Sequence, residues 1–317
     1  MRHVVARYRL SKMDVVTGAF SYTGRAIAEE LLDRGREVRT LTRRHTAGDP
    51  LVGRIDEAPL QFEDPTDLRR ALHGAETLYN TYWVRYARGG TTFDRAVANT
   101  RTLLEAAAAA GVQRVVHVSV TNPALDSPLP YFRGKAQVEA DVIASELSHA
   151  IVRPTLVFGA YDILLNNIAW GLRRFSVFPI SGDGSYRVQP VAVEDVATIC
   201  ADAGESTANG VMDAAGPEVL TYRQLIQLVA LAVGSKSRIV GVPRRVALLL
   251  ANVVGAAHRD VALTADELAG LEASLLISRD APLGTADFRS WISANANTLG
   301  HAYTSELARN FRGRQPL

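Results

Sequence analysis

The chain has 317 residues, 47% of them hydrophobic, and its 35 basic and 33 acidic residues leave a net charge of +2. A chain of this size can bury a large core in one large or two smaller domains. The balanced charge gives no argument for a nucleic-acid partner. The single Cys200 excludes an internal disulfide, and the scattered histidines show no metal-ligand spacing. We expect a cytoplasmic protein without a metal site.

Two segments bear on targeting and membranes. Residues 1–12 form a basic N-terminal tail without the apolar run of a secretory signal. The longest apolar stretch, residues 246–257, is too short to span a bilayer, which needs about 20 residues. We therefore expect no integral membrane segment. For residues 246–257 we favour a helix that is buried or faces a partner over membrane contact.

The first half of the chain alternates short apolar runs with helical patterns. Strands are predicted at residues 13–18, 37–44, 76–83, 114–120 and 149–159, and helices at 24–35, 65–74, 93–111 and 131–147. Strands separated by helical crossovers indicate a parallel sheet with helices on both faces. The predicted fold class is α/β, a doubly wound sheet of the Rossmann type.

The regular alternation of predicted strands and helices ends after Gly159. Residues 163–175 predict an amphipathic helix, and residues 179–186 a loop rich in Pro and Gly. A short strand near residue 190 and a helix from about Glu194 indicate a return to the main sheet. The predicted division is a dinucleotide-binding domain of residues 13–159 plus about 187–216, and a smaller, mostly helical substrate lobe of residues 160–186 plus 217–317.

A glycine-rich loop follows the first predicted strand, in "VVTGAFSYTGRAI". Gly18, Ser21 and Gly24 have the spacing of a dinucleotide-binding turn between a strand and a helix. Such a turn aims a helix N-terminus at the pyrophosphate. Ser21 replaces the middle glycine; its side chain narrows the approach, although its hydroxyl could donate to a phosphate. The alternative is an ordinary strand–helix turn. The predicted cofactor contacts here are Gly18, Phe20, Ser21, Tyr22, Thr23 and Gly24.

The end of the second predicted strand, "TLTRRH", has no carboxylate to hold the ribose 2′-hydroxyl of NAD. It has Arg43 and Arg44 instead, after Thr42, and a guanidinium suits a 2′-phosphate. The alternative is a pair of solvated arginines. We predict NADP, with NAD as the second choice. Further cofactor contacts are expected from Gln61, Phe62, Asn80, Thr81, Tyr82 and Val118.

The segment "YFRGK" places Tyr131 and Lys135 four residues apart on one face of a predicted helix. The preceding strand ends in Ser119 and Thr121. A phenol, an ammonium and a hydroxyl at one sheet edge can perform acid–base chemistry on a carbinol or carbonyl. The nearby cation would lower the pKa of the phenol. Lysine also suits this role better than arginine, because it is a compact point charge.

These motifs resemble the extended and atypical branch of the short-chain dehydrogenase/reductase superfamily. That branch includes NmrA-like proteins, sugar-nucleotide epimerases and the dinucleotide-binding accessory subunit of respiratory complex I. The resemblance covers roughly residues 13–230 and also rests on "HVSVTNP", "VRPTLVFG" and "GDGSYRVQPVAVEDVA". The last of these looks most like the complex I subunit and its bacterial epimerase-like relatives.

The resemblance implies site residues on matching positions. It implies a catalytic set of Thr121 (with Ser119 less favoured), Tyr131 and Lys135. Pro154 and Thr155 would border the nicotinamide, and Asn99 would support the neighbouring strand or a proton relay.

Other side chains suggest substrate contacts. Trp83 and Tyr86, with Tyr82, could build an aromatic wall over a substrate or simply pack against the second lobe. Arg187 lies where an epimerase could hold a phosphate, although an exposed arginine is the commoner explanation.

Two functions remain open from the sequence. The first is an NADP-dependent oxidoreductase or epimerase that uses Tyr131 as acid–base on a small-molecule substrate, of a less polar kind. The alternative is a non-catalytic cofactor-binding protein that senses redox state or stabilises an assembly, as the NmrA-like and complex I relatives suggest. A homodimer and a larger assembly both remain open.

Overall fold

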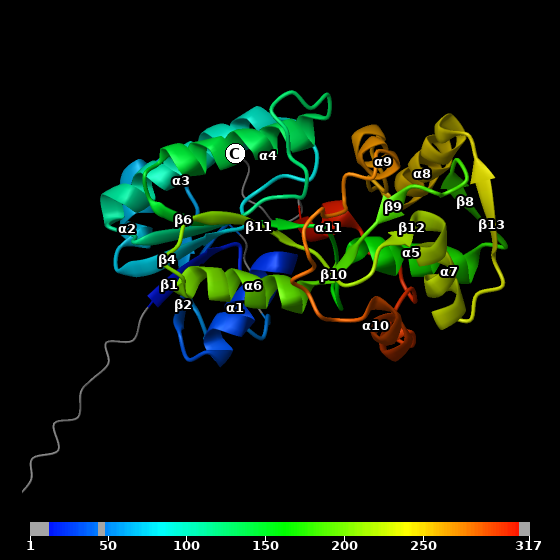
Figure 1. Cartoon of the computed structure of the whole chain (residues 1–317), viewed down its shortest axis with the longest axis horizontal. Coiled ribbons are helices and arrows are strands. Elements are labelled where there is room, and N and C mark those ends of the chain that lie inside the picture. The colour runs from blue at the N-terminus through cyan, green and yellow to red at the C-terminus, as the bar shows by residue number, and fades with distance from the viewer. Residues whose placement is uncertain (1–12, 44–47, 311–317) are drawn as a thin grey trace, which may run out of the picture.

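The computed structural model describes residues 13–43 and 48–310, so the predicted basic tail at 1–12 and Arg44 lie outside the described residues. Figure 1 shows two parts side by side, an α/β unit and a smaller lobe. None of the described helices combines the length and apolar character needed to cross a bilayer.

A seven-stranded sheet forms the centre of the α/β unit, with strand order β11-β6-β5-β4-β1-β2-β3 and parallel pairing throughout. Its strands are β1 (Met13–Thr17), β2 (Glu37–Thr42), β3 (Asp56–Pro59), β4 (Ala75–Asn80), β5 (Arg114–Val118), β6 (Ser148–Pro154) and β11 (Gly210–Ala214). The order reverses between β1 and β4. A crevice outside the carboxyl ends of strands at such a point is where ligands bind in open α/β sheets.

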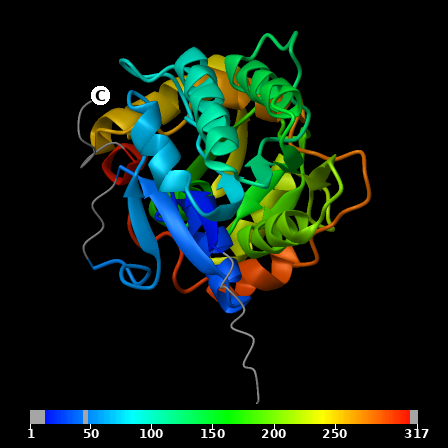
Figure 2. The ribbon, with the colours of Figure 1, turned by 90° about the vertical axis from the view of Figure 1, so that its left-hand side faces the viewer.

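Helices cover both faces of the sheet (Figures 1 and 2). They are α1 (Tyr22–Asp33) and α6 (Val193–Glu205) on one face, and α2 (Pro65–Leu72), α3 (Phe93–Ala110) and α4 (Pro130–Ala144) on the other. The predicted doubly wound parallel sheet is therefore confirmed.

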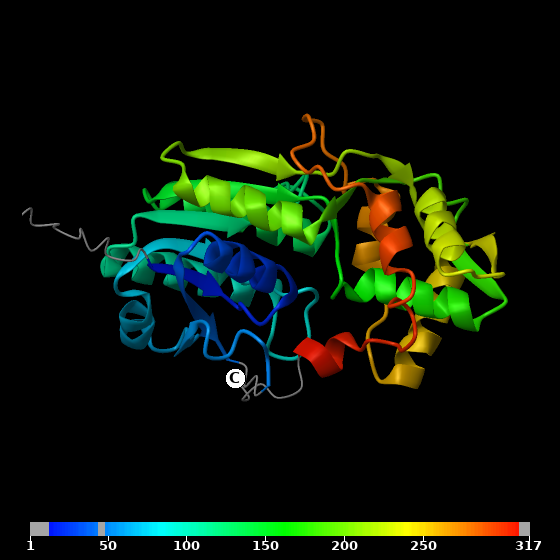
Figure 3. The same cartoon turned by 90° about the horizontal axis from the view of Figure 1, so that it is seen from below.

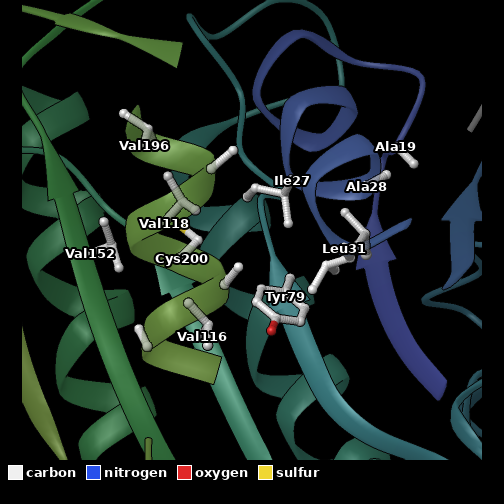
Figure 4. Close-up of a cluster of buried hydrophobic side chains, with 14 of the residues drawn as sticks. Ala19, Ile27, Ala28, Leu31, Tyr79, Val116, Val118, Val152, Val196 and Cys200 are labelled. Carbon is white, nitrogen blue, oxygen red and sulfur yellow. The ribbon is translucent and has the colours of Figure 1, made fainter. Parts of the chain in front are cut away.

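The core under α1 and α6 is built from small and β-branched side chains (Figure 4). Ile27 and Leu31 of α1 meet Val116 of β5 and Cys200 of α6, and all four are at most 2% exposed. Alternate residues of β5 point to opposite faces, so Val115 joins the other core, beneath α3 and α4. Burial on both faces explains why the strands read as continuous apolar runs.

The smaller lobe (Figure 3) joins two chain segments that are far apart in sequence. Its elements are α5 (Ile163–Arg174), β8 (Val177–Ser181), β9 (Arg187–Val188), β12 (Leu220–Thr221), α7 (Tyr222–Ala232), β13 (Arg238–Val242), α8 (Arg244–His258), α9 (Ala265–Glu272), α10 (Phe288–Asn295) and α11 (Glu306–Asn310). A third hydrophobic core, which includes Phe158, Leu225 and Phe288, holds it together.

The second half departs from the sequence expectation in three places. The predicted short strand near residue 190 does not join the main sheet, because β10 (Pro190–Ala192) pairs with β7 (Leu156–Phe158); the chain returns to the sheet through α6 and β11. The start of the predicted loop at 179–186 belongs to β8, because it pairs with β13. Residues 246–257 form a helix as expected, but Gly255 is the only residue of α8 that is fully buried.

Candidate functional site

The glycine-rich turn lies between β1 and α1 at the carboxyl edge of the sheet. Gly18 has φ of +71°, a conformation that favours glycine. A Cβ on Gly24 would lie 2.3 Å from the Gly18 carbonyl oxygen, so this position also needs glycine. The Ser21 hydroxyl donates to the same carbonyl at 2.6 Å. This hydrogen bond stabilises the turn. The first turn of α1 presents unpaired backbone N–H groups toward the crevice.

A cleft of about 110 Å³ opens beside this turn. It is bounded by the ends of β1 and β2 and by a segment that we call the cover segment, residues 81–92. The lining residues are Thr17, Gly18, Ser21, Leu41, Thr42, Arg43, Leu60, Thr81, Tyr82, Trp83, Val84, Thr91, Thr92, Arg95 and Asn99. The cleft thus brings together seven of the predicted site residues, from Gly18 to Trp83.

The lining carries cations and no carboxylate, as far as the described residues define it. Arg43 follows β2 directly, next to Thr42. Arg95, which the sequence prediction missed, lines the cleft from the first turn of α3 and pairs with Glu63 at 3.0 Å. Its position four residues upstream of Asn99 on the same helix could have suggested it.

The start of the cover segment is fixed to the sheet. The Thr81 amide donates to the Thr17 hydroxyl at 2.8 Å. Tyr82 packs on Phe62, with ring centroids 4.7 Å apart, and its hydroxyl accepts a hydrogen bond from Asn99 Nδ2 at 2.8 Å. Asn99 therefore supports the cover segment.

Trp83 lies against the predicted catalytic helix. Lys135 Nζ is 4.7 Å from the centroid of its ring, and the Tyr131 ring meets it edge-on with centroids 6.0 Å apart. A Cβ on Gly134 would lie 2.9 Å from the Trp83 ring, so a glycine between Tyr131 and Lys135 makes this contact feasible. Phe93 stacks on Trp83 at 5.9 Å. Trp83 therefore covers the Tyr/Lys pair, whereas an aromatic wall of all three rings over a substrate stays a prediction.

The rest of the cover segment is attached to the smaller lobe. Arg85 forms ion pairs with Glu267 of α9 at 2.5 Å and with Glu306 of α11 at 3.4 Å. Its guanidinium also lies 5.7 Å from the centroid of the buried Tyr86 ring. Tyr86 thus follows the alternative expectation of packing toward the second lobe.

Lys135 is 3% exposed, and its Nζ donates to the Val118 carbonyl at 2.8 Å. Burial lowers the pKa of Lys135 to about 7, an effect that the carboxylate of Glu139 partly opposes. An ammonium near neutrality can change its charge when its surroundings change. The Trp83 ring face stabilises the charged form by a cation–π contact.

Tyr131 has a different environment from the one that an activated phenol needs. Burial raises the pKa of Tyr131 to about 12; Glu267 adds to this rise and Arg85 opposes it. Its ring is surrounded by those of Trp83, Phe93 and Phe132. The structure therefore brings Tyr131 beside Lys135 without the depressed phenol pKa that the sequence interpretation expects.

The two candidate hydroxyls differ in their partners. Thr121 Oγ1 donates to the Pro154 carbonyl at 2.7 Å and is fully buried. Ser119 Oγ is buried and has no hydrogen-bond partner among the described residues. Ser119 directly follows β5, next to Val118, whose carbonyl holds Lys135. Of the two hydroxyls, that of Ser119 is the one without a partner among the described residues, although the family pattern favours Thr121.

A buried polar cluster lies near Lys135, and the sequence prediction had named only Asn80 among its members. Asn80 Nδ2 is 3.2 Å from His117 Nδ1, and the Thr17 hydroxyl donates to Asn80 Oδ1 at 3.3 Å. Burial, followed by the charge of Lys135, lowers the pKa of His117 well below its usual value. His117 is therefore neutral at physiological pH. Its position in the apolar run "RVVHVSV" is the one signal that sets it apart.

Several predicted site residues lie away from the cleft. Phe20 is buried in the core, and the Tyr22 hydroxyl is buried near Gly159. Gln61 is exposed, and so is Arg187 in β9. Thr23, Phe62, Asn80, Val118, Pro154 and Thr155 are near the sheet edge but do not line the cleft. No group of three or more potential metal ligands occurs within residues 13–43 and 48–310.

Comparison with known families gives one matching model, described as NAD(P)H-binding, over residues 18–163. The chain is 25% identical over 250 residues to the mitochondrial "NADH dehydrogenase [ubiquinone] 1 alpha subcomplex subunit 9" of Arabidopsis thaliana. The aligned region covers 74% of this chain and 61% of that protein. The chain is 28% identical over 252 residues to the chloroplastic "divinyl chlorophyllide a 8-vinyl-reductase" of Oryza sativa subsp. indica, with 73% and 61% covered. The chain thus spans about three fifths of the length of these relatives.

Solved structures share the fold. A nucleoside-diphosphate-sugar epimerase from Staphylococcus aureus superposes with a TM-score of 0.70 at 14% identity, covering 89% of this chain and 99% of that one. The UDP-glucose 4-epimerase of Thermus thermophilus in complex with NAD has a TM-score of 0.65 at 19% identity, covering 92% and 99%.

A glycine-rich turn at the carboxyl edge of a doubly wound sheet defines an NAD(P)-binding protein of the Rossmann class, and the family model agrees. The family model and the relatives support the resemblance to the extended and atypical short-chain dehydrogenase/reductase superfamily, and the epimerase structures share its fold. The resemblance seen in the sequence is confirmed.

Proposed function

We propose that this protein is an NAD(P)(H)-dependent oxidoreductase that acts at a carbinol or carbonyl carbon, with Tyr131 exchanging the proton. The observation that carries the proposal is the placement of Tyr131 and Lys135 against Trp83, which lines the glycine-rich cleft, with the unpartnered Ser119 next to the Val118 carbonyl that holds Lys135. When bound, the nicotinamide supplies or accepts the hydride. Ser119 would orient the substrate oxygen, and Lys135 would lower the pKa of the phenol once Trp83 no longer covers the pair.

The residues of the cleft suit such a cofactor at its adenosine and phosphate end. Gly18 and Gly24 leave the close backbone approach that a pyrophosphate needs. Arg43, beside Thr42, would pair with the 2′-phosphate of NADP. The described lining has no carboxylate that would bind the 2′-hydroxyl of NAD. These features support NADP over NAD.

The side chains around Tyr131 favour a substrate of low polarity. Trp83, Phe93 and Phe132 surround its ring, whereas Arg187 lies exposed outside the cleft. An aromatic surround binds apolar groups well and offers little to a sugar diphosphate. A ketone or secondary alcohol reaction is therefore a better proposal than sugar-nucleotide epimerisation.

The test starts with binding of NADPH and NADH, followed by the absorbance of the reduced cofactor across a panel of apolar ketones, aldehydes and sugar nucleotides. Tyr131→Phe should reduce turnover by about a hundredfold or more, because it removes the proton-exchanging group, and should leave the Kd for the cofactor within about twofold. The exposed Tyr161→Phe, on the loop before α5, is the matched control. Turnover by Tyr131→Phe at the wild-type rate would refute the role of Tyr131.

A second function has support of its own, namely non-catalytic NAD(P)(H) binding in a redox sensor or an assembly. Burial raises the pKa of Tyr131 to about 12, and Trp83 covers Lys135. The similarity to a mitochondrial NADH dehydrogenase subunit motivates the assembly version. Tight NADPH binding without oxidation by any member of the panel would favour this function. Sedimentation velocity would then distinguish a monomer, a homodimer and a larger complex.

A further inference from the structure

Helix α8 presents an apolar face to solvent. Leu249 is 61% exposed and Val253 is 59% exposed, with Val246 and Leu250 near 40%. At 100° per residue these four side chains fall on one side of the helix. Ala247, Ala251 and Val254 lie on the other side and are partly buried against the smaller lobe. Of the two expectations, a buried helix or one that faces a partner, burial does not hold for this face; α8 lies at the margin of the lobe (Figures 1 and 3).

The stretch of sequence that contains α8 is cationic. Residues 219–259 contain six of the 35 basic residues and no Asp or Glu, although the chain as a whole is nearly neutral. Lys236, Arg238 and Arg245 are exposed and make no ion pair with the residues that the structure describes. Arg245 lies at the flank of the apolar face, in the first turn of α8. An unpaired cation at the flank of exposed leucine and valine side chains suits an anionic partner with an apolar layer beneath it.

We propose that α8 docks this protein on the surface of a membrane that contains anionic phospholipids. The helix has 15 residues and is about 22 Å long, so it can lie in the interfacial plane but cannot span the bilayer. Its apolar face would enter the boundary between headgroups and acyl chains, and Arg245 at its flank would contact phosphates. A second copy of the chain is a poorer partner for this face, because it would bring the same positive charges together.

The test uses the full chain with vesicles of phosphatidylcholine alone, and with vesicles that contain about one-third phosphatidylglycerol. We expect the wild-type chain to float with the anionic vesicles and to be released by high salt. The double variant Leu249→Gln/Val253→Gln should bind about tenfold less, because it loses two apolar side chains at the interface. Leu125→Gln on the α/β unit, where Leu125 is 62% exposed, is the matched control and should bind like the wild type.

A charge variant tests the second half of the proposal. Arg245→Gln should weaken binding by about fivefold. Arg54→Gln removes an exposed arginine of the α/β unit and should change nothing. Equal binding by wild type and both α8 variants, equal binding to neutral vesicles, or no binding at all would overturn the proposal. A dimer that Leu249→Gln/Val253→Gln abolishes, without vesicle binding, would assign the face to a second copy instead. None of these outcomes depends on the proposed enzymatic function.

Discussion

At the residue scale, Lys135 is one of three lysines in a chain with 32 arginines. Its ammonium is buried between the Val118 carbonyl and the Trp83 ring, and burial lowers its pKa to about 7. An arginine would keep its charge at any physiological pH. Lysine instead gives the site a cation that can lose its proton near neutrality, and its compact head fits beneath Trp83.

This lowered pKa predicts a pH-dependent stability. Between about pH 7 and 10.4 the unfolded chain keeps the Lys135 proton and the folded chain does not, so the free energy of unfolding rises with pH. The slope from this residue is at most about 1.4 kcal/mol per pH unit. Urea unfolding across this range should show the rise in the wild type relative to Lys135→Met, which cannot titrate. A constant difference between the two proteins would contradict the lowered pKa.

At the element scale, the cover segment joins the two parts of the molecule. Thr81 is bonded to Thr17 of β1, whereas Arg85 pairs with α9 and α11. Trp83 lies between these attachments and covers Lys135. The position of α9 and α11 is thereby coupled to access to the Tyr/Lys pair.

Replacing Arg85 tests this coupling. Arg85→Met should destabilise the protein by about 1–3 kcal/mol, because it leaves Glu267 and the largely buried Glu306 without their shared cation. Amide exchange in residues 81–92 should speed up and Trp83 fluorescence should change. Arg101→Met, which removes an exposed pair with Asp141, should cost less than about 1 kcal/mol. Unchanged exchange in the cover segment would show that Arg85 does not hold it.

At the scale of the whole molecule, several polar links cross between the α/β unit and the long segment after α9. Asn122 is one of them: its Nδ2 donates to the carbonyls of Leu275 at 2.9 Å and Ile277 at 2.8 Å. Asp195 of α6 is another, since its carboxylate accepts from the amides of Thr285 and Ala286. These contacts fix a connection that has no regular secondary structure against the sheet edge.

Asn122→Gly tests one such link without adding strain, because Asn122 has φ of +55°. Loss of two hydrogen bonds should lower the free energy of unfolding by about 1–3 kcal/mol. Thermal melts followed by circular dichroism and by tryptophan fluorescence should stay coincident at a lower Tm. Glu146→Gly, at an exposed position with φ of +59°, removes no such bond and should be neutral or slightly stabilising. A wild-type Tm for Asn122→Gly would contradict this role of Asn122.

The sequence by itself determined the α/β class, the strand–turn–helix around Gly18 and the pairing of Tyr131 with Lys135 on one helix. These features depend on local periodicity and on glycines that no other residue can replace. Tertiary structure alone decided that β11 rejoins the sheet, that the Thr121 hydroxyl is bonded to Pro154, and that Trp83 covers Lys135. It also decided that one face of α8 is exposed. Each of these depends on contacts between residues distant in sequence, which local patterns do not encode.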